Sequence, residues 1–227
     1  MASGRRTAGR LLRLAMARHE ARYSLSTLDG MFVECGASLR YNVAPGQDAW
    51  VVRGAREPVR LRWGLLPRWK GHGGTRGPMI EAAPIEAVPA TPLLRDAFKS
   101  QRCLILADGC YAWNELKQPV WFHAEPRRVI AFAGVWAENQ DDGVPSFAML
   151  TGEPLVTRVS EPMPIVIDEA DYDSWLTGDL DGALAMCAPR TLERWRSDHV
   201  TTWMASAEHD DPKCIAPVGN PLQGELF

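Results

Sequence analysis

Short runs of alternating apolar residues, each closed by glycine, proline or aspartate, are the feature that most restricts how this chain can fold. Alternation places every second side chain on one face of an extended strand, which is the pattern of half-buried β-strands. The residues between the runs favour turns. The pattern therefore predicts a curled antiparallel sheet, with strands at Trp50–Arg53, Val59–Trp63, Cys103–Ala107, Val120–Ala124, Val129–Trp136 and Ser146–Leu150.

Helical spacing is confined to a few segments. Residues 8–22 carry apolar side chains on one face, Pro92–Ser100 opens with a proline at the first helical position, and Asp168–Leu176 opens with acidic residues. We expect a late strand at His199–Ala205 and a glycine-rich surface loop at Lys70–Pro78. Together the segments predict one α+β domain over residues 1–227.

Composition excludes several classes of protein. With 46% hydrophobic and 23% charged residues, the chain is neither disordered nor collagen-like. The longest apolar run, Val129–Ala137, is far shorter than the roughly 20 residues that span a bilayer. Five cysteines without CxxC spacing argue against a disulfide framework and a zinc site. The apolar run Leu11–Met16 is too short for a signal peptide, so we expect a cytoplasmic protein.

The net charge of −3 conceals an asymmetry. Residues 1–102 carry a net charge of +9, and residues 103–227 carry −12. A basic half can face a polyanion such as nucleic acid. The simpler interpretation, which we favour from charge alone, is that the two halves pack together and pair their charges.

No general catalytic motif is present. The chain lacks the nucleophile elbow, the zinc-protease helix, the phosphate-binding loop and the dinucleotide fingerprint. The five histidines are scattered, and the acidic residues between Asp168 and Asp173 lack calcium-loop spacing. We therefore expect no metal and no cofactor.

Three segments carry a resemblance that goes further. YNVAPGQ stands at residues 41–47, RWGLLPRW at 62–69 and RCLILADGCYAW at 102–113. FAGVW at 132–136, MPIVI at 163–167 and CIAP at 214–217 follow in order. Over about residues 38–217, with Gly4-Arg5 near the start, the chain resembles the SRAP family, the SOS response-associated peptidases. The resemblance implies a SRAP-like α+β fold, a curled antiparallel sheet or barrel flanked by short helices.

What the resemblance implies is chemistry on DNA. Members of the family bind single-stranded DNA and recognise abasic sites in the DNA damage response. Removal of the initiator Met exposes a Cys, whose amine and thiol together form a thiazolidine cross-link with the ring-opened sugar. An Asn, a Glu and a His position the sugar and move protons.

This chain departs from the family at each of those positions. Ser3 stands where the family has Cys, and removal of Met1 would expose Ala2. The Asn-Ala-Arg segment falls around Glu81, without Asn or Arg, although the register over 79–90 is open by a residue. The Glu is Ala112 and the His is Ser160. We therefore expect a degenerate member that forms no thiazolidine.

Two routes to residual activity remain in the sequence. An amine on Ala2, with a reference pKa of about 8, is able to form an imine with an abasic aldehyde and promote strand cleavage. Cys110, next to Ala112, is a second possible nucleophile, but it more simply replaces a core Phe.

Contact with DNA is expected to outlast the catalysis. By resemblance, the contacting residues are Arg5, Asn42, Pro45, Trp69, Arg95 and Arg102. The loss of Arg from two family motifs predicts weak, salt-sensitive binding.

Three hypotheses follow. The first is a pseudoenzyme bound to single-stranded DNA, and it is the one we favour. The second is an enzyme with altered chemistry, either an imine-forming lyase or a peptidase-like hydrolase. The third is an interaction module without a DNA function. The sequence does not define an oligomeric state.

Overall fold

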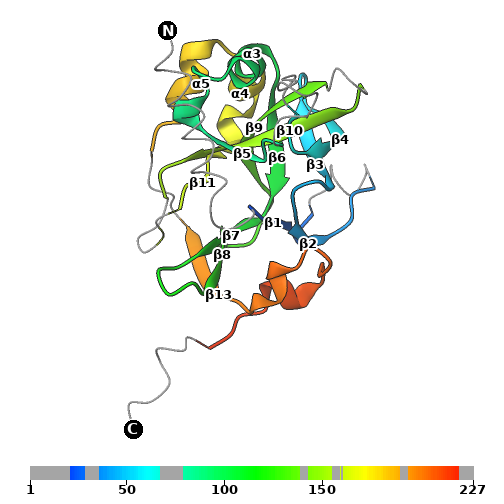
Figure 1. The fold of residues 1–227 in the computed structure, drawn as a ribbon, viewed down its shortest axis with the longest axis vertical. Helices are drawn as coiled ribbons and strands as arrows, with labels where there is room; N and C mark the ends of the chain where they lie inside the picture. The colour runs from blue at the N-terminus through cyan, green and yellow to red at the C-terminus, as the bar shows by residue number, and fades with distance from the viewer. Residues whose placement is uncertain are drawn as a thin grey trace, which may run out of the picture.

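The computed structural model describes residues 21–28, 36–66, 79–138, 143–154, 159, 161–189 and 194–219. Within these ranges the chain forms two β-sheets, with short α-helices gathered at one end of the molecule (Figure 1).

The larger sheet closes into a five-stranded barrel. β3 pairs with β4 and β6, β6 pairs with β9, β9 pairs with β10, and β10 returns to β4. The last pairing is parallel and the other four are antiparallel. Short strands β5 and β11 extend the barrel along β10, and β12 extends it along β9. The bounds are β3 (Asp48–Arg53), β4 (Glu57–Trp63), β5 (Ala82–Pro84), β6 (Arg102–Ala107), β9 (Ile130–Glu138), β10 (Pro145–Gly152), β11 (Met163–Pro164) and β12 (Val166–Ile167).

The smaller sheet is open and antiparallel, in the order β13-β8-β7-β1-β2. Its strands are β1 (Tyr23–Leu25), β2 (Arg40–Val43), β7 (Gly109–Trp113), β8 (Pro119–Ala124) and β13 (Trp195–His199). In Figure 1 it lies at the end opposite the helices, with the C-terminal segment next to β2.

A single residue, Asp108, separates the two sheets. β6 of the barrel ends at Ala107, and β7 of the open sheet begins at Gly109. A Cβ on Gly109 would lie 2.5 Å from the Phe122 carbonyl oxygen, so glycine is required for β8 to approach this closely. The chain therefore passes from one sheet to the other through a fixed junction.

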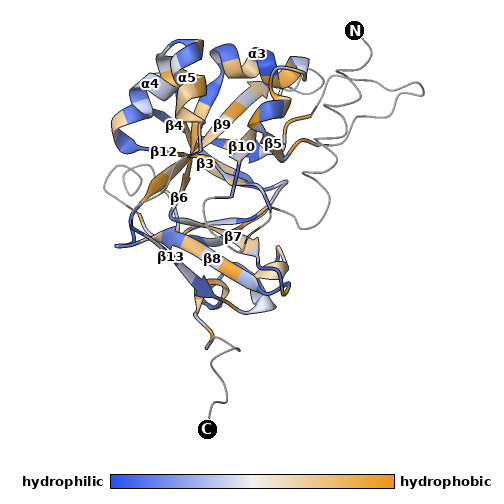
Figure 2. Cartoon of the chain, turned by 90° about the vertical axis from the view of Figure 1, so that its left-hand side faces the viewer, coloured by the Kyte–Doolittle hydropathy of each residue, from blue (hydrophilic) through white to orange (hydrophobic). Residues whose placement is uncertain are grey.

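The helices cover one end of the barrel. They are α3 (Pro92–Ser100), α4 (Tyr172–Thr177) and α5 (Leu180–Met186), with 3-10 turns η1 (Ile85–Ala87), η2 (Glu169–Asp171), η3 (Thr202–Ala205) and η4 (Pro212–Ile215). Figure 2 shows the helices as alternating hydrophobic and hydrophilic stretches, as expected for helices that bury one side. α3 buries Leu94, Ala97 and Phe98.

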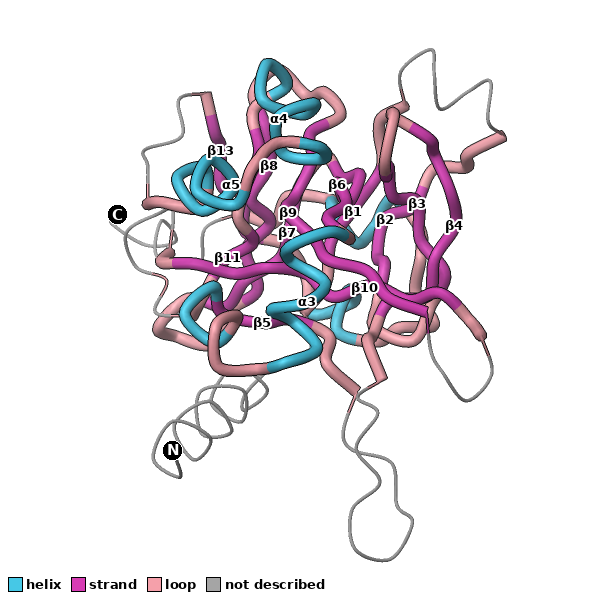
Figure 3. The backbone as a smooth tube through the Cα atoms, turned by 90° about the horizontal axis from the view of Figure 1, so that it is seen from above, coloured by secondary structure: helices cyan, strands magenta, loops and turns pink. Residues whose placement is uncertain are grey.

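The buried guanidinium of Arg102 joins two of these helices. It donates to the carbonyl oxygens of Phe98, at 2.8 Å, and of Trp175 and Gly178. Phe98 lies in the last turn of α3, and the other two carbonyls belong to the end of α4. These carbonyls have no partner within their own helices, and one cation satisfies them. Figure 3, seen from the helix end, shows α3 crossing the strands with α4 and α5 beside it.

Most of the predicted elements are confirmed. The six predicted strands correspond to β3, β4, β6, β8, β9 and β10, and α3 spans Pro92–Ser100 as predicted. The helix predicted over Asp168–Leu176 is η2 followed by α4. Of the segment 8–22, only 21 and 22 are described, and they are not helical. Residues 70–78 lie outside the described ranges.

The strand predicted over His199–Ala205 was wrong. β13 ends at His199, and Thr202–Ala205 forms the 3-10 turn η3. The Thr201 hydroxyl accepts from the Trp203 amide and turns the chain away from the sheet.

Charge pairing between the two halves of the chain is observed. Arg40 pairs with Asp210, and Arg56 pairs with Asp173 at 2.7 Å. Among the helices that the structure describes, none is long and apolar enough to cross a membrane.

The junction gives a first prediction. Asp108→Asn would put an amide donor against groups that already donate, so we expect a loss of roughly 3–5 kcal/mol in the free energy of unfolding. Urea unfolding measures it. The matched control is Asp173→Asn, at an exposed pair, where we expect little change. Equal losses in the two variants would contradict the role of Asp108.

Buried acidic protons predict a loss of stability in alkali. Burial raises the pKa of Cys110 to about 12, and it also raises the pKa of Tyr23, Cys103 and Tyr111. In the unfolded chain, thiols ionise at about pH 8.5 and phenols at about pH 10. Groups with a raised folded pKa stabilise the fold below the unfolded pKa, and this contribution is lost as the pH rises.

We therefore expect the urea midpoint to fall progressively above about pH 8.5. Cys110→Ala, measured as a control, should show a shallower fall because one ionisation is absent. A midpoint that stays level to about pH 11 would count against this explanation.

Candidate functional site

The three-residue strand β1 determines which part of the chain lies near Ala112, the position at which the family has its reactive Glu. β1 lies between β2 and β7, with Tyr23 opposite Val43 on one side and opposite Cys110 on the other. The Tyr111 amide donates to the Arg22 carbonyl oxygen at 3.1 Å. Arg22 therefore enters the sheet beside the stretch of β7 that contains Ala112.

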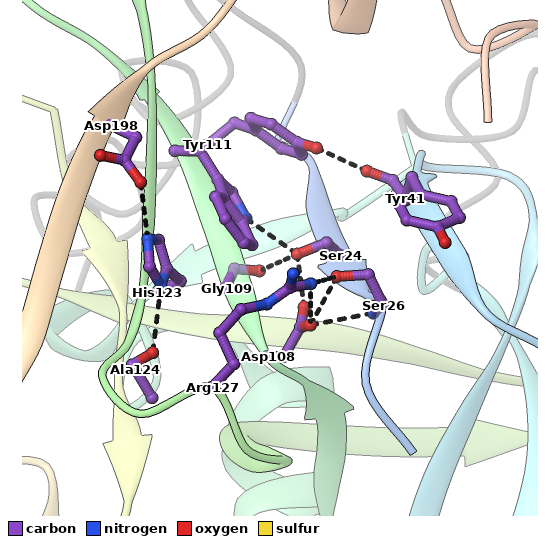
Figure 4. A network of polar contacts seen from close by, with 11 residues as sticks. Ser24, Ser26, Tyr41, Asp108, Gly109, Tyr111, His123, Ala124, Arg127 and Asp198 are labelled. Atoms are coloured by element: carbon purple, nitrogen blue, oxygen red, sulfur yellow. Dashed lines mark hydrogen bonds and ion pairs between the residues drawn. The ribbon is translucent and has the colours of Figure 1, made fainter. Parts of the chain in front are cut away.

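The carboxylate of Asp108 holds β1 in this place, as Figure 4 shows. Its Oδ1 accepts from the Ser24 hydroxyl at 2.6 Å. Its Oδ2 accepts from the Ser26 amide at 3.0 Å and from the Ser26 hydroxyl at 2.6 Å. Arg127 lies 3.4 Å from the same oxygen. Asp108 is fully buried, so its carboxylate stabilises the fold and is not accessible to a ligand.

Ala112 stands in apolar surroundings. It is 6% exposed, pairs with Val120, and belongs to the same apolar cluster as Trp63 and Val159. A methyl group neither carries a proton nor accepts one, so this position has no acid–base capacity.

Glu81 lies close to the same cluster through its backbone. Its carbonyl oxygen accepts from the Trp63 indole N–H at 2.8 Å and from the Met149 amide at 3.0 Å. Ser160 lies outside the described residues, but its neighbour Val159 is buried in the cluster that contains Ala112. Glu81, Ala112 and Val159 are thus linked through one tryptophan and its apolar neighbours.

Two residues expected to contact DNA are buried instead. The Asn42 side-chain amide donates to the carbonyl oxygens of Met204, Ser206 and His209, at 2.8–2.9 Å. The Arg102 guanidinium is committed to the ends of α3 and α4, and only 4% of the residue is exposed. Both side chains are committed to carbonyl oxygens of the protein, which argues against the expected contact of either with a phosphate.

Two other expected contacts lie at the surface. Pro45 is half-buried in the turn between β2 and β3, where the Gln47 amide donates to Ala44. Arg95 is exposed on α3 and pairs with its neighbour Asp96, at 3.2 Å. Exposed pairs of this kind are weak and leave the cation accessible. Ala2, Ser3, Arg5 and Trp69 lie outside the described residues.

The other polar clusters hold strands together. His123 is buried, with Nε2 3.0 Å from Asp198 of β13 and Nδ1 3.0 Å from the Ala124 carbonyl oxygen (Figure 4). It joins β8 to β13. Across the described ranges, no three His, Cys, Asp or Glu side chains gather as a metal site.

Arg22 and Arg40 have structural roles that the sequence pattern did not predict. Arg22 is buried directly before β1, and Arg40 opens β2 and pairs with Asp210. A signal for the first was present, since Tyr23 and Leu25 alternate with polar residues at the strand period. The helical pattern assigned to residues 8–22 concealed it.

Comparison with known proteins gives one consistent result. A family model described as SOS response associated peptidase (SRAP) matches residues 11–209. Abasic site processing protein YoqW of Bacillus subtilis is 27% identical over 190 residues, covering 77% of this chain and 84% of the relative. Abasic site processing protein HMCES of Gallus gallus is 23% identical, covering 70% of this chain and 56% of the relative.

Solved structures show the same fold. A protein from Bacteroides thetaiotaomicron superposes with a TM-score of 0.69 at 15% identity, covering 92% of this chain and 96% of the other. A protein from Bordetella bronchiseptica gives a TM-score of 0.66 at 19% identity, covering 80% and 99%.

Burial makes a prediction about the thiol nearest the centre. Cys110 is 1% exposed, and burial raises its pKa to about 12, so it stays a neutral thiol at physiological pH. In a native titration with a disulfide reagent at about pH 8, we expect the Cys110→Ala variant to show as many rapidly reacting thiols as the unmodified protein. The same variant should react with one thiol fewer after denaturation. Loss of a fast-reacting thiol in the native variant would reinstate Cys110 as a nucleophile.

Proposed function

This chain belongs to the SRAP family, and from that membership we propose that it binds single-stranded DNA at abasic sites without forming the thiazolidine cross-link. Curated relatives carry the name abasic site processing protein, which supports a role in handling abasic DNA. The absence of the cross-link is a proposal about this chain alone, and it rests on the residues around Ala112.

The carrying observation is that a stretch without a thiol, Ala21-Arg22, lies against the strand that contains Ala112. The thiazolidine needs the amine and the thiol of one terminal residue close to the acid–base group. Here the segment beside β7 is Ala21-Arg22, and its amides are peptide-bonded on both sides. Ala2 and Ser3, which the resemblance aligned with the family terminus, precede Ala21 by 18 residues or more.

The substitution of Ala112 supports the same conclusion independently. A buried methyl replaces the carboxylate that would assist proton transfer, and general acid–base groups contribute roughly 10²–10⁴-fold to a reaction rate. The loss of the terminal thiol and of this carboxylate removes both the nucleophile and its assistant.

Binding of DNA does not require the groups that form the cross-link. Arg95 is exposed, and the turn at Pro45 is half-buried at the surface. Phosphate contacts by a few cations predict weak affinity that decreases with salt. We therefore propose retention of the DNA by charge and shape.

The test is incubation of the purified protein with an abasic-site oligonucleotide, with and without borohydride, read on a denaturing gel beside a native binding gel. We expect binding at low salt on the native gel and no covalent band in either lane. A band that survives without borohydride would mean that another residue supplies the second bond.

A band that requires borohydride would point instead to an imine on an amine such as that of Ala2. Comparison with a variant acetylated at its N-terminus would then identify the amine. A protein that binds no oligonucleotide at low salt would favour an interaction module, and the proposed function would fall.

A further inference from the structure

The outer edge of β2 holds a carboxylate from the far end of the chain. The Asp210 Oδ1 accepts from the Tyr41 amide at 2.6 Å and from the Asn42 amide at 2.9 Å. Its Oδ2 pairs with the Nε of Arg40. One anion is thus bound by a guanidinium and two consecutive backbone N–H groups.

This donor set is suited to a phosphate. Guanidinium and backbone amides are the groups that proteins use most often on the phosphates of nucleic acids. The pair is partly open to solvent, with side-chain exposures of 24% for Arg40 and 27% for Asp210. An incoming anion can therefore reach it without unfolding of the strand.

The segment that carries Asp210 does not depend on this carboxylate alone. The buried amide of Asn42 binds three of its carbonyl oxygens, at Met204, Ser206 and His209. Gln47 donates to a fourth carbonyl, at Ala207, at 3.3 Å. The Asp210 side chain can leave the edge of β2 while the backbone of the segment stays attached.

The position of the edge links it to DNA. β2 ends two residues before Pro45, and Pro45 lies in the turn expected to contact DNA. Residues 1–102 carry the positive excess, whereas Glu208, Asp210 and Asp211 in the covering segment are acidic. Asp211 is held by the Lys213 amide and the Trp203 indole, and the Lys213 amide is the main cause of its lowered pKa. The segment thus places negative charge next to Arg40 at the edge of β2.

We propose that the Arg40 guanidinium and the Tyr41 and Asn42 amides form a binding site for a backbone phosphate of single-stranded DNA, which Asp210 occupies in the unbound protein. The inference rests on the proposed function. Asp210 acts as a competing anion, so DNA must displace it. The need for displacement lowers the affinity for strands that offer few phosphates.

The experiment measures fluorescence anisotropy of a labelled single-stranded oligonucleotide over a range of salt concentrations. Asp210→Ala empties the site, so we expect binding about 3- to 10-fold tighter at low salt. We also expect a salt slope steeper by about 0.7, the value of one further phosphate contact on a single strand. Arg40→Ala combined with Asp210→Ala should lose most of both gains.

Asp173→Ala is the matched control. It removes the same charge from another exposed pair between the two halves and releases Arg56. We expect a smaller gain in affinity and no steeper slope. Thermal unfolding of each variant checks that the fold persists.

The outcomes separate the two proposals. Equal gains in affinity for Asp210→Ala and Asp173→Ala would overturn this inference alone. The same holds if Asp210→Ala gains no affinity while the unmodified protein binds, because Asp210 would then have only a structural role. Absence of binding by both the unmodified protein and Asp210→Ala at low salt would overturn this inference and the proposed function together. Binding seen only in Asp210→Ala would support it strongly.

Discussion

A single buried carboxylate, that of Asp108, fixes how the two sheets of this protein meet. The chain leaves the barrel at Ala107 and enters the open sheet at Gly109, which leaves Asp108 no access to water. A buried charge is tolerated only where hydrogen bonds and an opposite charge satisfy it. Ser24, Ser26 and Arg127 do so here, and the first two belong to β1 and to the residues just after it. The junction therefore positions β1, and through it the backbone of Arg22 against Tyr111, the neighbour of Ala112 in β7.

Other buried polar groups are required by the fold in the same way. Asn42 anchors the C-terminal segment, Tyr111 donates to the Tyr41 carbonyl oxygen at 2.5 Å, and the Trp63 indole N–H is satisfied by the Glu81 carbonyl oxygen. Replacement of any of these leaves buried polar groups without partners, which is costly. Ala112 makes no side-chain hydrogen bond, because its methyl group packs in an apolar cluster.

Much of the fold could be predicted from the sequence, because alternation and punctuation mark long strands well. β1 was missed because its three residues follow directly on a segment with helical spacing, and η3 was mistaken for a strand because the alternation did not reveal the turn that the Thr201 hydroxyl caps. The site was harder to predict. Nothing in the sequence tells whether Asn42 and Arg102 face a ligand or the interior, since burial decides this and only the fold defines burial. The pairing of Arg40 with Asp210 joins residues 170 positions apart.

The central proposal is that a stretch of chain without a thiol lies against the strand that contains Ala112, so that an abasic sugar is held without a bond to the protein. A crystal structure of the complex with a short single-stranded oligonucleotide containing one abasic site tests it most directly. The predicted result is a sugar near Ala112, with no electron density joining its C1 atom to any residue. Continuous density between the sugar and a side chain or an amine would contradict it.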